Sequence, residues 1–410
     1  MSGESCQGYY GGGWISSLQQ LFAGDETIDL SLAFVTSQGL EFKREGNFCY
    51  YPIHYSKTEW QKIKEYYGGY KSINTSAYVN EVLSIVDEVK PDVIHVFGLE
   101  NPLANVLGKL NAPLVVHLQG VINPIANAFW PVGINKWNFL LPPSKREWLL
   151  RNGFVYNYKS LKARAERELE LFSHLRLVMG RTRWDKNVIA LYAPQAKYFH
   201  VNEVLRPVFY DHQGEWSPQV GKFKILSVIS ETVYKGLDLV LKTSQLLTSL
   251  DFQFEWNVVG VNATDRIVGM FERILGVDSH KVNINYLGIM DSEKLCDTAL
   301  ASSLYVHTSY IDNSPNSLCE AQMLGLPVLS TNVGGISSLM DNCNLLQLVP
   351  ANGVCELAHS IKQMHDNLEL AYEIGMDGYE IAKKRHERDK IKNDLIEVYK
   401  SVLDINMYTR

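Results

Sequence analysis

The stretch SLYVHTSYIDNSPNSLCEAQMLGLPVLSTNVGGI, residues 303–336, carries the clearest fold signal in the chain. It predicts a buried strand that ends near Ser309, a polar turn, a helix that begins at Ser314-Pro315, and a second strand followed by two glycines. Strand, helix and strand in this order are typical of a parallel sheet, in which ligands bind beyond the carboxyl ends of the strands. We therefore expect a ligand site around the turn that precedes this helix.

The start of the predicted helix is suited to bind an anion. Ser314 fits the N-cap and Pro315 fits the first helical position, so the next backbone amides have no partner inside the helix. Those amides belong to Asn316, Ser317 and Leu318. They suit a diphosphate, and Glu320 is placed to accept hydrogen bonds from two neighbouring hydroxyls, as on a ribose. Gly334 and Gly335 supply a second flexible turn. On these residues alone, an ordinary helix start with a solvated Glu320 explains the pattern equally well.

The same alternation of strands and helices runs along the whole chain. It breaks at residues 211–221, DHQGEWSPQVG, a polar segment with Gly and Pro that we interpret as a linker. Continuous apolar strands separated by helices indicate parallel sheets that are covered on both faces. The sequence therefore predicts an α/β protein with two Rossmann-like domains, residues 1–210 and 222–385, facing a central cleft. The expected strands are 28–35, 91–98, 113–120 and 175–180 in the first domain, and 222–230, 254–260, 282–288, 303–309 and 327–331 in the second.

Residues 386–410 are expected to form a terminal helix. Its apolar side chains recur at spacings of four, three and four, which is one face of a helix. They are Ile391, Leu395, Val398 and Val402. A single stripe of this kind is typical of a packing helix, and we expect it to pack back on the first domain.

The N-terminal segment QGYYGGGWISSLQQLF places Gly11, Gly12 and Gly13 in front of a helical pattern. A glycine loop that cradles phosphate normally follows a buried strand. No strand fits before these glycines. Either the first strand of this domain is missing, or the native chain begins further upstream.

Composition excludes several function classes. The chain has 410 residues and a net charge of −6 without a pole of one sign, so nucleic acid is not an expected partner. The sequence has no uncharged apolar run of about 18 residues, and the start has no signal peptide, which predicts a cytoplasmic protein. None of the six cysteines stands in a CxxC pair, which favours reduced thiols and no metal. The sequence also has no P-loop, and it lacks the acidic residue that a dinucleotide fold needs after the strand at 28–35.

The frame DNSPNSLCEAQMLGLPVLSTNVGG resembles the donor-site signature of the retaining glycosyltransferases of family 4, which have the two-domain GT-B fold. Asp312 and Glu320 take its two acidic places. The segment ILSVISETVYKGLDLVL also resembles the family, with Lys235 in the place of the lysine that holds the donor diphosphate. The resemblance implies catalytic roles for Asp312, Lys235 and Glu320. It further implies a donor-binding set of Ser230, Asn313, Asn316, Ser317, Leu318, Gly334 and Gly335.

The resemblance implies transfer of a sugar, with retention of anomeric configuration, from a nucleotide-diphosphate sugar to a glycan or polyprenyl-linked acceptor. Members of this bacterial branch assemble surface polysaccharides. Lys235 and the helix amides would stabilise the leaving diphosphate without a metal or other cofactor, and Asp312 would hold hydroxyls of the transferred sugar. The chain has no Asp-x-Asp pair, the signature of metal-bridged diphosphate sites in the other large glycosyltransferase fold.

The chain departs from the family at three positions, of which the first is Asp312, an aspartate in the place of a glutamate and thus shorter by one methylene. Ser230 stands where an arginine is common, so that positive charge is either absent or supplied from elsewhere, for example by Arg181 or Arg183. Gln119 stands where a histidine is common, and glutamine cannot act as a base at neutral pH. His117 lies on the same side of the strand as Gln119, and it is either packed or in contact with substrate. The expected cleft residues of the first domain are Gly11, Gly12, Gly13, His117, Gln119 and Arg181.

Residues 121–150 interleave aromatic and basic side chains. The aromatic ones are Trp130, Trp137, Phe139 and Trp148, and the basic ones are Lys136, Lys145 and Arg146. The pattern fits either a buried aromatic insert or a peripheral contact with the inner face of the plasma membrane. Two other functions stay open at this level. One is a sugar-nucleotide 2-epimerase of the same fold, and the other is a non-catalytic nucleotide-binding partner subunit.

Overall fold

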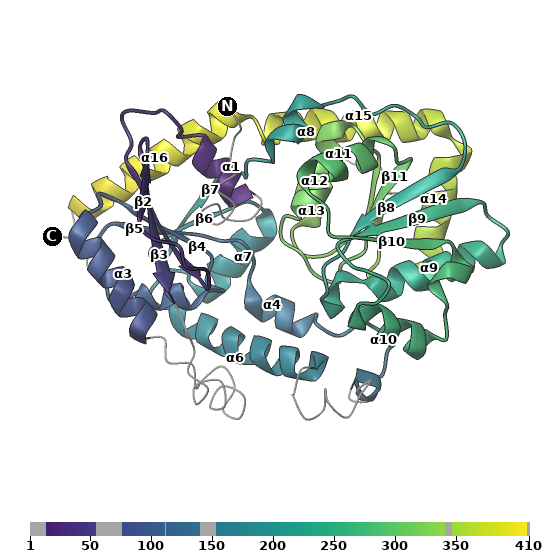
Figure 1. The fold of residues 1–410 in the computed structure, drawn as a ribbon, viewed down its shortest axis with the longest axis horizontal. Helices are drawn as coiled ribbons and strands as arrows, with labels where there is room; N and C mark the ends of the chain where they lie inside the picture. The colour runs from purple at the N-terminus through teal and green to yellow at the C-terminus, as the bar shows by residue number, and fades with distance from the viewer. Residues whose placement is uncertain (1–13, 55–75, 111, 140–152, 341–346, 408–410) are drawn as a thin grey trace.

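The computed structural model describes residues 14–54, 76–110, 112–139, 153–340 and 347–407. Two α/β units lie side by side, and the last two helices run along one edge of both (Figure 1). Within the described residues, no helix is long and apolar enough to cross a membrane.

The first unit holds two sheets. One is parallel, in the order β4-β5-β6-β7, and its strands are β4 (Ile94–Phe97), β5 (Leu114–His117), β6 (Leu177–Gly180) and β7 (Lys197–His200). The other has the order β1-β3-β2 and consists of β1 (Leu30–Thr36), β2 (Lys43–Glu45) and β3 (Phe48–His54). β1 pairs in parallel with β3, a strand that we did not predict. The sequence FCYYPIH hides β3 because it contains a proline and no regular alternation.

The helices of the first unit cover these sheets. They are α1 (Trp14–Gln20), α3 (Ser76–Val89), η2 (Pro102–Val106), α4 (Ile122–Asn127), η3 (Lys136–Phe139), α6 (Phe154–Phe172) and α7 (Arg183–Tyr192). α7 begins with a capping box, in which Thr182 and Asp185 exchange hydrogen bonds between side chain and backbone. This box fixes Thr182 and Asp185 at the carboxyl end of β6, on the side of the second unit.

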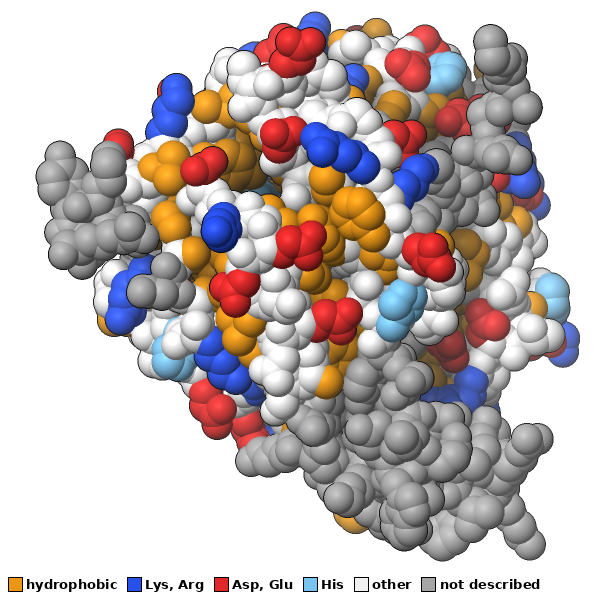
Figure 2. Space-filling model, turned by 60° about the vertical axis from the view of Figure 1, so that its left-hand side comes forward, with side chains coloured by type: hydrophobic (Ala, Val, Ile, Leu, Met, Phe, Trp, Pro, Cys, Tyr) orange, Lys and Arg blue, Asp and Glu red, His pale blue; other side chains and the backbone are white. Residues whose placement is uncertain are grey.

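Acidic and basic side chains are mixed on the face that Figure 2 turns forward.

The second unit contains one parallel sheet in the order β10-β9-β8-β11-β12-β13. Its strands are β8 (Phe223–Val228), β9 (Phe254–Val259), β10 (Ile284–Gly288), β11 (Leu304–His307), β12 (Val328–Thr331) and β13 (Leu348–Val349). Each of the five strands predicted here has an observed counterpart. The helices are α8 (Pro207–Asp211), η4 (Val233–Lys235), α9 (Leu237–Ser249), α10 (Arg266–Leu275), η5 (Ser279–Val282), α11 (Ser292–Leu300), α12 (Asn316–Leu324), α13 (Ile336–Leu339), α14 (Val354–Asp366) and α15 (Leu368–Arg385). The sheet with helices on its faces is the predicted α/β architecture.

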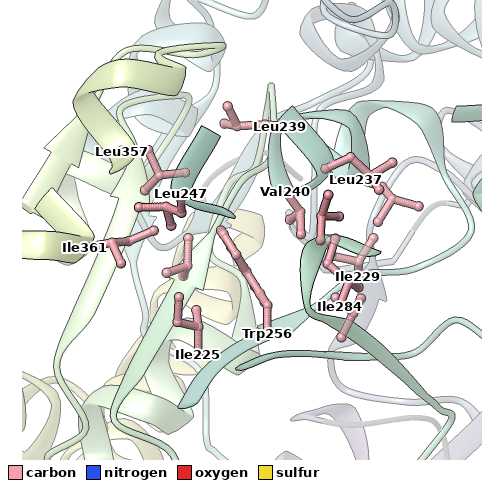
Figure 3. Packing of buried hydrophobic residues seen from close by; sticks show 14 of the residues in the cluster. Ile225, Ile229, Leu237, Leu239, Val240, Leu247, Trp256, Ile284, Leu357 and Ile361 are labelled. Carbon is pink, nitrogen blue, oxygen red and sulfur yellow. The ribbon is translucent and has the colours of Figure 1, made fainter. Parts of the chain in front are cut away.

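The core of the second unit is built around Trp256. Figure 3 shows its indole surrounded by aliphatic side chains of the sheet, α9 and α14, including Ile225, Leu247 and Ile361. The indole N–H donates to the Ser227 hydroxyl at 3.0 Å, so the buried polar atom is satisfied. This packing fixes β8, the strand that leads to Lys235.

The chain crosses between the units twice. Val204 packs in the first unit and Leu205 in the second, so the first crossing lies there. The segment 211–221, expected as a linker, packs on the second unit instead. Its Trp216 is 3% exposed and donates through its indole N–H to the Ser302 carbonyl. The polar residues around Trp216 hid this anchor in the sequence.

The second crossing follows α15. The chain then continues as α16 (Arg388–Met407) along the first unit (Figure 1). The four stripe residues are buried in one cluster with Tyr50, Val115 and other apolar side chains of the first unit. α16 thus ties the C-terminal end to the first unit through apolar packing.

Candidate active site

Lys235 and Asp312 form an ion pair beyond the carboxyl ends of two neighbouring strands. Lys235 ends η4, after β8, and Asp312 follows β11. The distance from Lys235 Nζ to Asp312 Oδ2 is 2.6 Å, and His307 Nε2 lies 3.3 Å from the same oxygen. Burial raises the pKa of Asp312, but the charges and hydrogen bonds of Lys235 and His307 together outweigh it and hold that pKa well below its usual range. Both partners are therefore charged at neutral pH.

Gly236 explains how the lysine reaches this position. Its φ is +78°, and a Cβ there would collide with the carbonyl oxygen of Thr308. The backbone after β8 can therefore lie directly against the end of β11. Two hydrogen bonds hold it there, from the Thr308 hydroxyl to the Lys235 carbonyl and from the Tyr310 amide to the Tyr234 carbonyl.

The start of α12 differs in part from the prediction. The N-cap is Pro315, and Asn316 is the first helical residue. Ser314 does not cap the helix, because its hydroxyl donates to Glu203. The amide of Leu318 donates to the Pro315 carbonyl, so it is not an open donor as we expected. The anion site predicted at this helix start is therefore reduced to the amides of Asn316 and Ser317.

Glu320 is buried and paired with an arginine that the sequence did not suggest. Its side chain is 2% exposed, and its two carboxylate oxygens accept from Arg206 Nε at 2.7 Å and Arg206 Nη2 at 2.6 Å. Glu320 also lines a small pocket that has room for about one water molecule. The other lining residues are Phe209, Leu226, Val228, Leu295, Ala299, Tyr305, Ser317 and Ala321. The solvated Glu320 of the simple helix-start interpretation is not observed.

Asn313 joins the two units. Its amide nitrogen donates to Asp185 Oδ2 at 3.0 Å, and its amide oxygen accepts from the Thr182 hydroxyl at 2.7 Å. Gly334 and Gly335 lie against the same loop. Side chains at these positions would collide with the carbonyl oxygens of Asp312 and Asn313. In this structure the three predicted donor-site residues shape the Asp312 loop and fix it to the first unit.

The expected replacement for the missing arginine is not supplied by Arg181. Ser230 is exposed, and its hydroxyl lies 3.2 Å from that of Thr232. Arg181 is 5% exposed, forms a buried ion pair with Glu203 and donates to the Gln119 carbonyl at 2.8 Å. Its guanidinium is therefore engaged between the units. Arg183 is exposed beside it on α7.

His117 has the packed environment that was one of its two interpretations. It is fully buried, and its ring stacks with those of His95 and Phe97 at 5.3 and 6.0 Å between centroids. Burial lowers the pKa of His117 well below its usual value, so the ring is neutral. Gln119 is partly exposed at the end of β5. Gly11, Gly12 and Gly13 lie outside the described residues.

Sequence reasoning missed a carboxylate on the first unit. Glu100 follows β4, and its Oε1 accepts from the Gly120 amide at 2.8 Å. Burial raises the pKa of Glu100 above its usual value. Arg164 of α6 donates to the Glu100 carbonyl at 3.2 Å. An acidic residue two positions after Gly98, which ends a predicted strand, was the available signal.

The aromatic segment 121–139 packs mainly between the units. Phe129 and Phe139 are buried, with their rings 6.2 Å from Tyr234 and 6.1 Å from Phe271 of the second unit. Trp130 is partly buried beside them, whereas Trp137 is 71% exposed. Most of the described part is thus a buried insert, over the second unit as well as the first. Lys145, Arg146 and Trp148 lie outside the described residues.

One group within the described residues has the spacing of metal ligands. Glu203, Cys319 and His386 are buried, and their ligand atoms lie within 4.8 Å of one another. The Glu203 carboxylate already pairs with Arg181 and accepts from Ser314. A guanidinium at this carboxylate opposes a cation, so we assign the group to the hinge between the units.

Comparison with known proteins agrees with this geometry. Residues 223–367 match the family model described as Glycosyl transferases group 1. A stretch of 115 residues is 30% identical to the putative teichuronic acid biosynthesis glycosyltransferase TuaC of Bacillus subtilis. That match covers 28% of this chain and 29% of TuaC, so it spans less than a third of the relative.

Solved structures are similar over nearly the whole chain. Sucrose-phosphate synthase from Thermosynechococcus elongatus is 13% identical, with a TM-score of 0.69, over 96% of this chain and 93% of that one. An E. coli structure described as trehalose-6-phosphate bound with UDP-2-fluoro glucose is 12% identical, with a TM-score of 0.64, over 94% and 96%. Anabaena Alr3699/HepE, in complex with UDP and glucose, is 14% identical, with a TM-score of 0.58, over 87% of each chain. At these identities the likeness shows the fold. The chain has the two-domain GT-B fold, and its residues 223–367 carry a domain of the glycosyl transferases group 1 type.

Proposed function

We propose that this protein is a retaining, metal-independent glycosyltransferase of family 4. It transfers a sugar from a nucleotide-diphosphate sugar to a glycan or polyprenyl-linked acceptor during assembly of a bacterial surface polysaccharide. The observation that carries the proposal is the Lys235–Asp312 pair at the carboxyl edge of the second sheet. Lys235 ends η4, and Asp312 lies in the loop that leads into α12. The Bacillus relative is named for teichuronic acid biosynthesis, and similar solved structures are complexes with UDP or a UDP-sugar.

The donor site works by exchange of partners. When a diphosphate enters, Lys235 turns from Asp312 to the phosphate oxygens, and the amides of Asn316 and Ser317 add partial positive charge. Asp312 then accepts hydrogen bonds from hydroxyls of the transferred sugar. Glu320 accepts from the ribose hydroxyls. Lys235 and the two helix amides stabilise the charge of the leaving diphosphate, so the reaction needs no metal ion.

The proposed transfer step is the same-face attack that the resemblance to family 4 implies. The bond between the anomeric carbon and the leaving phosphate oxygen breaks, and the acceptor oxygen forms the new bond on the same face. The acceptor proton passes to the leaving phosphate. The configuration of the sugar is retained.

The first unit receives the acceptor. Its groups beside the donor loop include Gln119, whose carbonyl accepts from Asn313 at 3.3 Å, and the neighbouring Glu100–Gly120 pair. The exposed Trp137 is the described side chain of the aromatic segment that is best placed for a peripheral contact with the inner face of the plasma membrane. We propose that the protein lies in the cytoplasm, where Trp137 would make this contact.

The test is calorimetric titration of the full chain with UDP, GDP, ADP and their sugars in EDTA. We expect one nucleotide to bind without metal. Anomeric proton signals in NMR spectra of the glycoside product then report retention. An epimerised nucleotide sugar as product would replace the proposal by the 2-epimerase. Binding without turnover across a panel of polyprenyl-linked and glycan acceptors would favour the partner subunit, and no binding of any nucleotide would overturn the donor site.

A further inference from the structure

Arg206 lies on the first crossing between the units, directly before α8. It forms the bidentate pair with Glu320 described above. The side chain of Glu320 is 2% exposed and that of Arg206 is 25% exposed. The carboxylate is thus buried, while the guanidinium lies at the border with solvent.

A second contact holds the guanidinium. Arg206 lies over the ring of Phe209 with 5.0 Å between the guanidinium carbon and the ring centroid. Phe209 lines the same pocket as Glu320, together with Tyr305 and Ser317. The hydroxyls of Tyr305 and Ser317 are 2.7 Å apart. The pocket therefore combines apolar walls with a fixed group of polar atoms.

A buried carboxylate of this kind needs a balancing charge to stay ionised. Burial raises the pKa of Glu320, and the hydrogen bonds from Arg206 lower it again without cancelling the rise. An ionised carboxylate oxygen has two acceptor positions. The guanidinium of Arg206 occupies one position on each oxygen of Glu320, and the backbone amide of Arg206 donates a third hydrogen bond to the carboxylate. One acceptor position therefore stays open for a hydroxyl. A protonated carboxyl would offer fewer acceptors and one donor.

We propose that Arg206 is a positioning residue of the donor site, which orients Glu320 and balances its charge so that the carboxylate accepts a hydrogen bond from a ribose hydroxyl. This inference rests on the proposed function, which assigns the ribose to Glu320. Arg206 itself acts through Glu320. A lysine could balance the charge but could not fix both oxygens, because only the planar guanidinium is bidentate.

The test compares ribose with dideoxyribose on the full chain. The probes are UDP and GDP and their 2′,3′-dideoxy forms, titrated calorimetrically in EDTA. We expect the parent to bind the ribose form at least roughly tenfold more tightly than the dideoxy form, because hydrogen bonds to a charged group are lost. In Arg206→Met this ratio falls close to one, and Arg206→Lys gives an intermediate ratio. The ratio does not depend on the folded fraction, so loss of stability alone leaves it unchanged.

The matched control is Arg388→Met. Arg388 lies just after the second crossing and over an aromatic ring, that of Tyr210, at 5.4 Å. The structure places no contact between Arg388 and Glu320 among its described hydrogen bonds and ion pairs. This variant should keep the parent ratio.

Titration gives an independent readout. In Arg206→Met the ratio should rise with pH, because Glu320 loses the cation that kept its pKa down and ionises only at higher pH. The charged and titratable groups that face Glu320 within the described residues are Arg206, Tyr305, Cys296 and Cys319. Burial raises the pKa of Cys296 to about 12 and also raises those of Tyr305 and Cys319, so these groups stay neutral from pH 6 to 9. The phosphate titration is common to both probes and cancels in the ratio.

The outcomes separate the two proposals. If the parent binds a nucleotide with equal affinity in its ribose and dideoxy forms, Glu320 does not bind the ribose, and the proposed function fails at that residue. A parent with a high ratio and an Arg206→Met variant with the same ratio at every pH overturns the role of Arg206. If Arg206→Met does not fold, the neutral Arg206→Gln replaces it, and an unchanged ratio there overturns the inference as well.

Discussion

Replacing Lys235 with methionine tests the donor site most directly. The change removes the ammonium group, whose Nζ lies 2.6 Å from Asp312 Oδ2 and 5.8 Å from the Tyr234 ring centroid, and keeps a stem of similar length. Two consequences follow from the structure. A bound diphosphate loses a positive charge, and Asp312 loses its nearest cation.

The expected magnitude comes from the exchange of partners. A hydrogen bond to a charged group contributes about 1.5–3 kcal/mol, which corresponds to roughly 10–150-fold in Kd. In the free protein Lys235 already pairs with Asp312, so binding replaces one anion by another. The side chains are 22% and 16% exposed, and solvent therefore screens the pair in part. We expect the low end of the range, a loss of about tenfold in affinity for the nucleoside diphosphate.

The assay is the same calorimetric titration in EDTA, applied to the parent, Lys235→Met, Asp312→Asn and the double variant. Asp312→Asn releases Lys235 from its anion, so the nucleoside diphosphate should bind at least as tightly as to the parent. The double variant should bind like Lys235→Met, because the effect of Asp312 on the nucleotide acts through Lys235. A Kd for Lys235→Met equal to that of the parent, in a variant shown to be folded by urea denaturation, would refute the reasoning and remove Lys235 from the site.

Three further predictions concern transfer, stability and pH. Asp312→Asn should keep nucleotide binding and lower the rate of sugar transfer, and full turnover would exclude a role for Asp312 in holding the sugar. Leu395→Ala, at a fully buried position of α16, should lower the free energy of unfolding by about 2–5 kcal/mol in urea titrations, and the exposed Leu403→Ala should serve as the mild control. Burial lowers the pKa of His95 to about 3 and lowers those of His117 and His386 well below 6.5. On acidification the unfolded chain protonates these histidines at a higher pH than the folded protein does. The free energy of unfolding is therefore highest above about pH 6.5 and falls below it, by up to about 1.4 kcal/mol per pH unit for each ring. His386→Gln should flatten that slope, and an identical slope from pH 7.5 to 5 would contradict the assignment.

The architecture of the second unit was predictable because its signals are local. Each strand from β8 to β12 is a short run bounded by turn residues, and in β8, β9, β11 and β12 burial on both faces produces a mostly apolar sequence. In the first unit the signal is weaker. β3 has a proline and mixed aromatic residues, and although β1 was predicted, its pairing with β3 is recognised only in three dimensions. The crossing was placed too late, because the polar residues of 211–221 hide the buried Trp216.

The sequence by itself determined the α/β class and the presence of two units, and it predicts Lys235 and Asp312 as residues of the candidate site, whereas their ion pair is seen only in the tertiary structure. These features depend on short runs of residues and on the family frame around Asp312. Only the tertiary structure decided which partners the buried polar groups have. Asn313 bonds to Thr182, Ser314 to Glu203 and Glu320 to Arg206, and these partners are 131, 111 and 114 positions apart. No local pattern encodes such pairs, because a buried polar atom takes whichever partner the packing of the two units brings within hydrogen-bond distance.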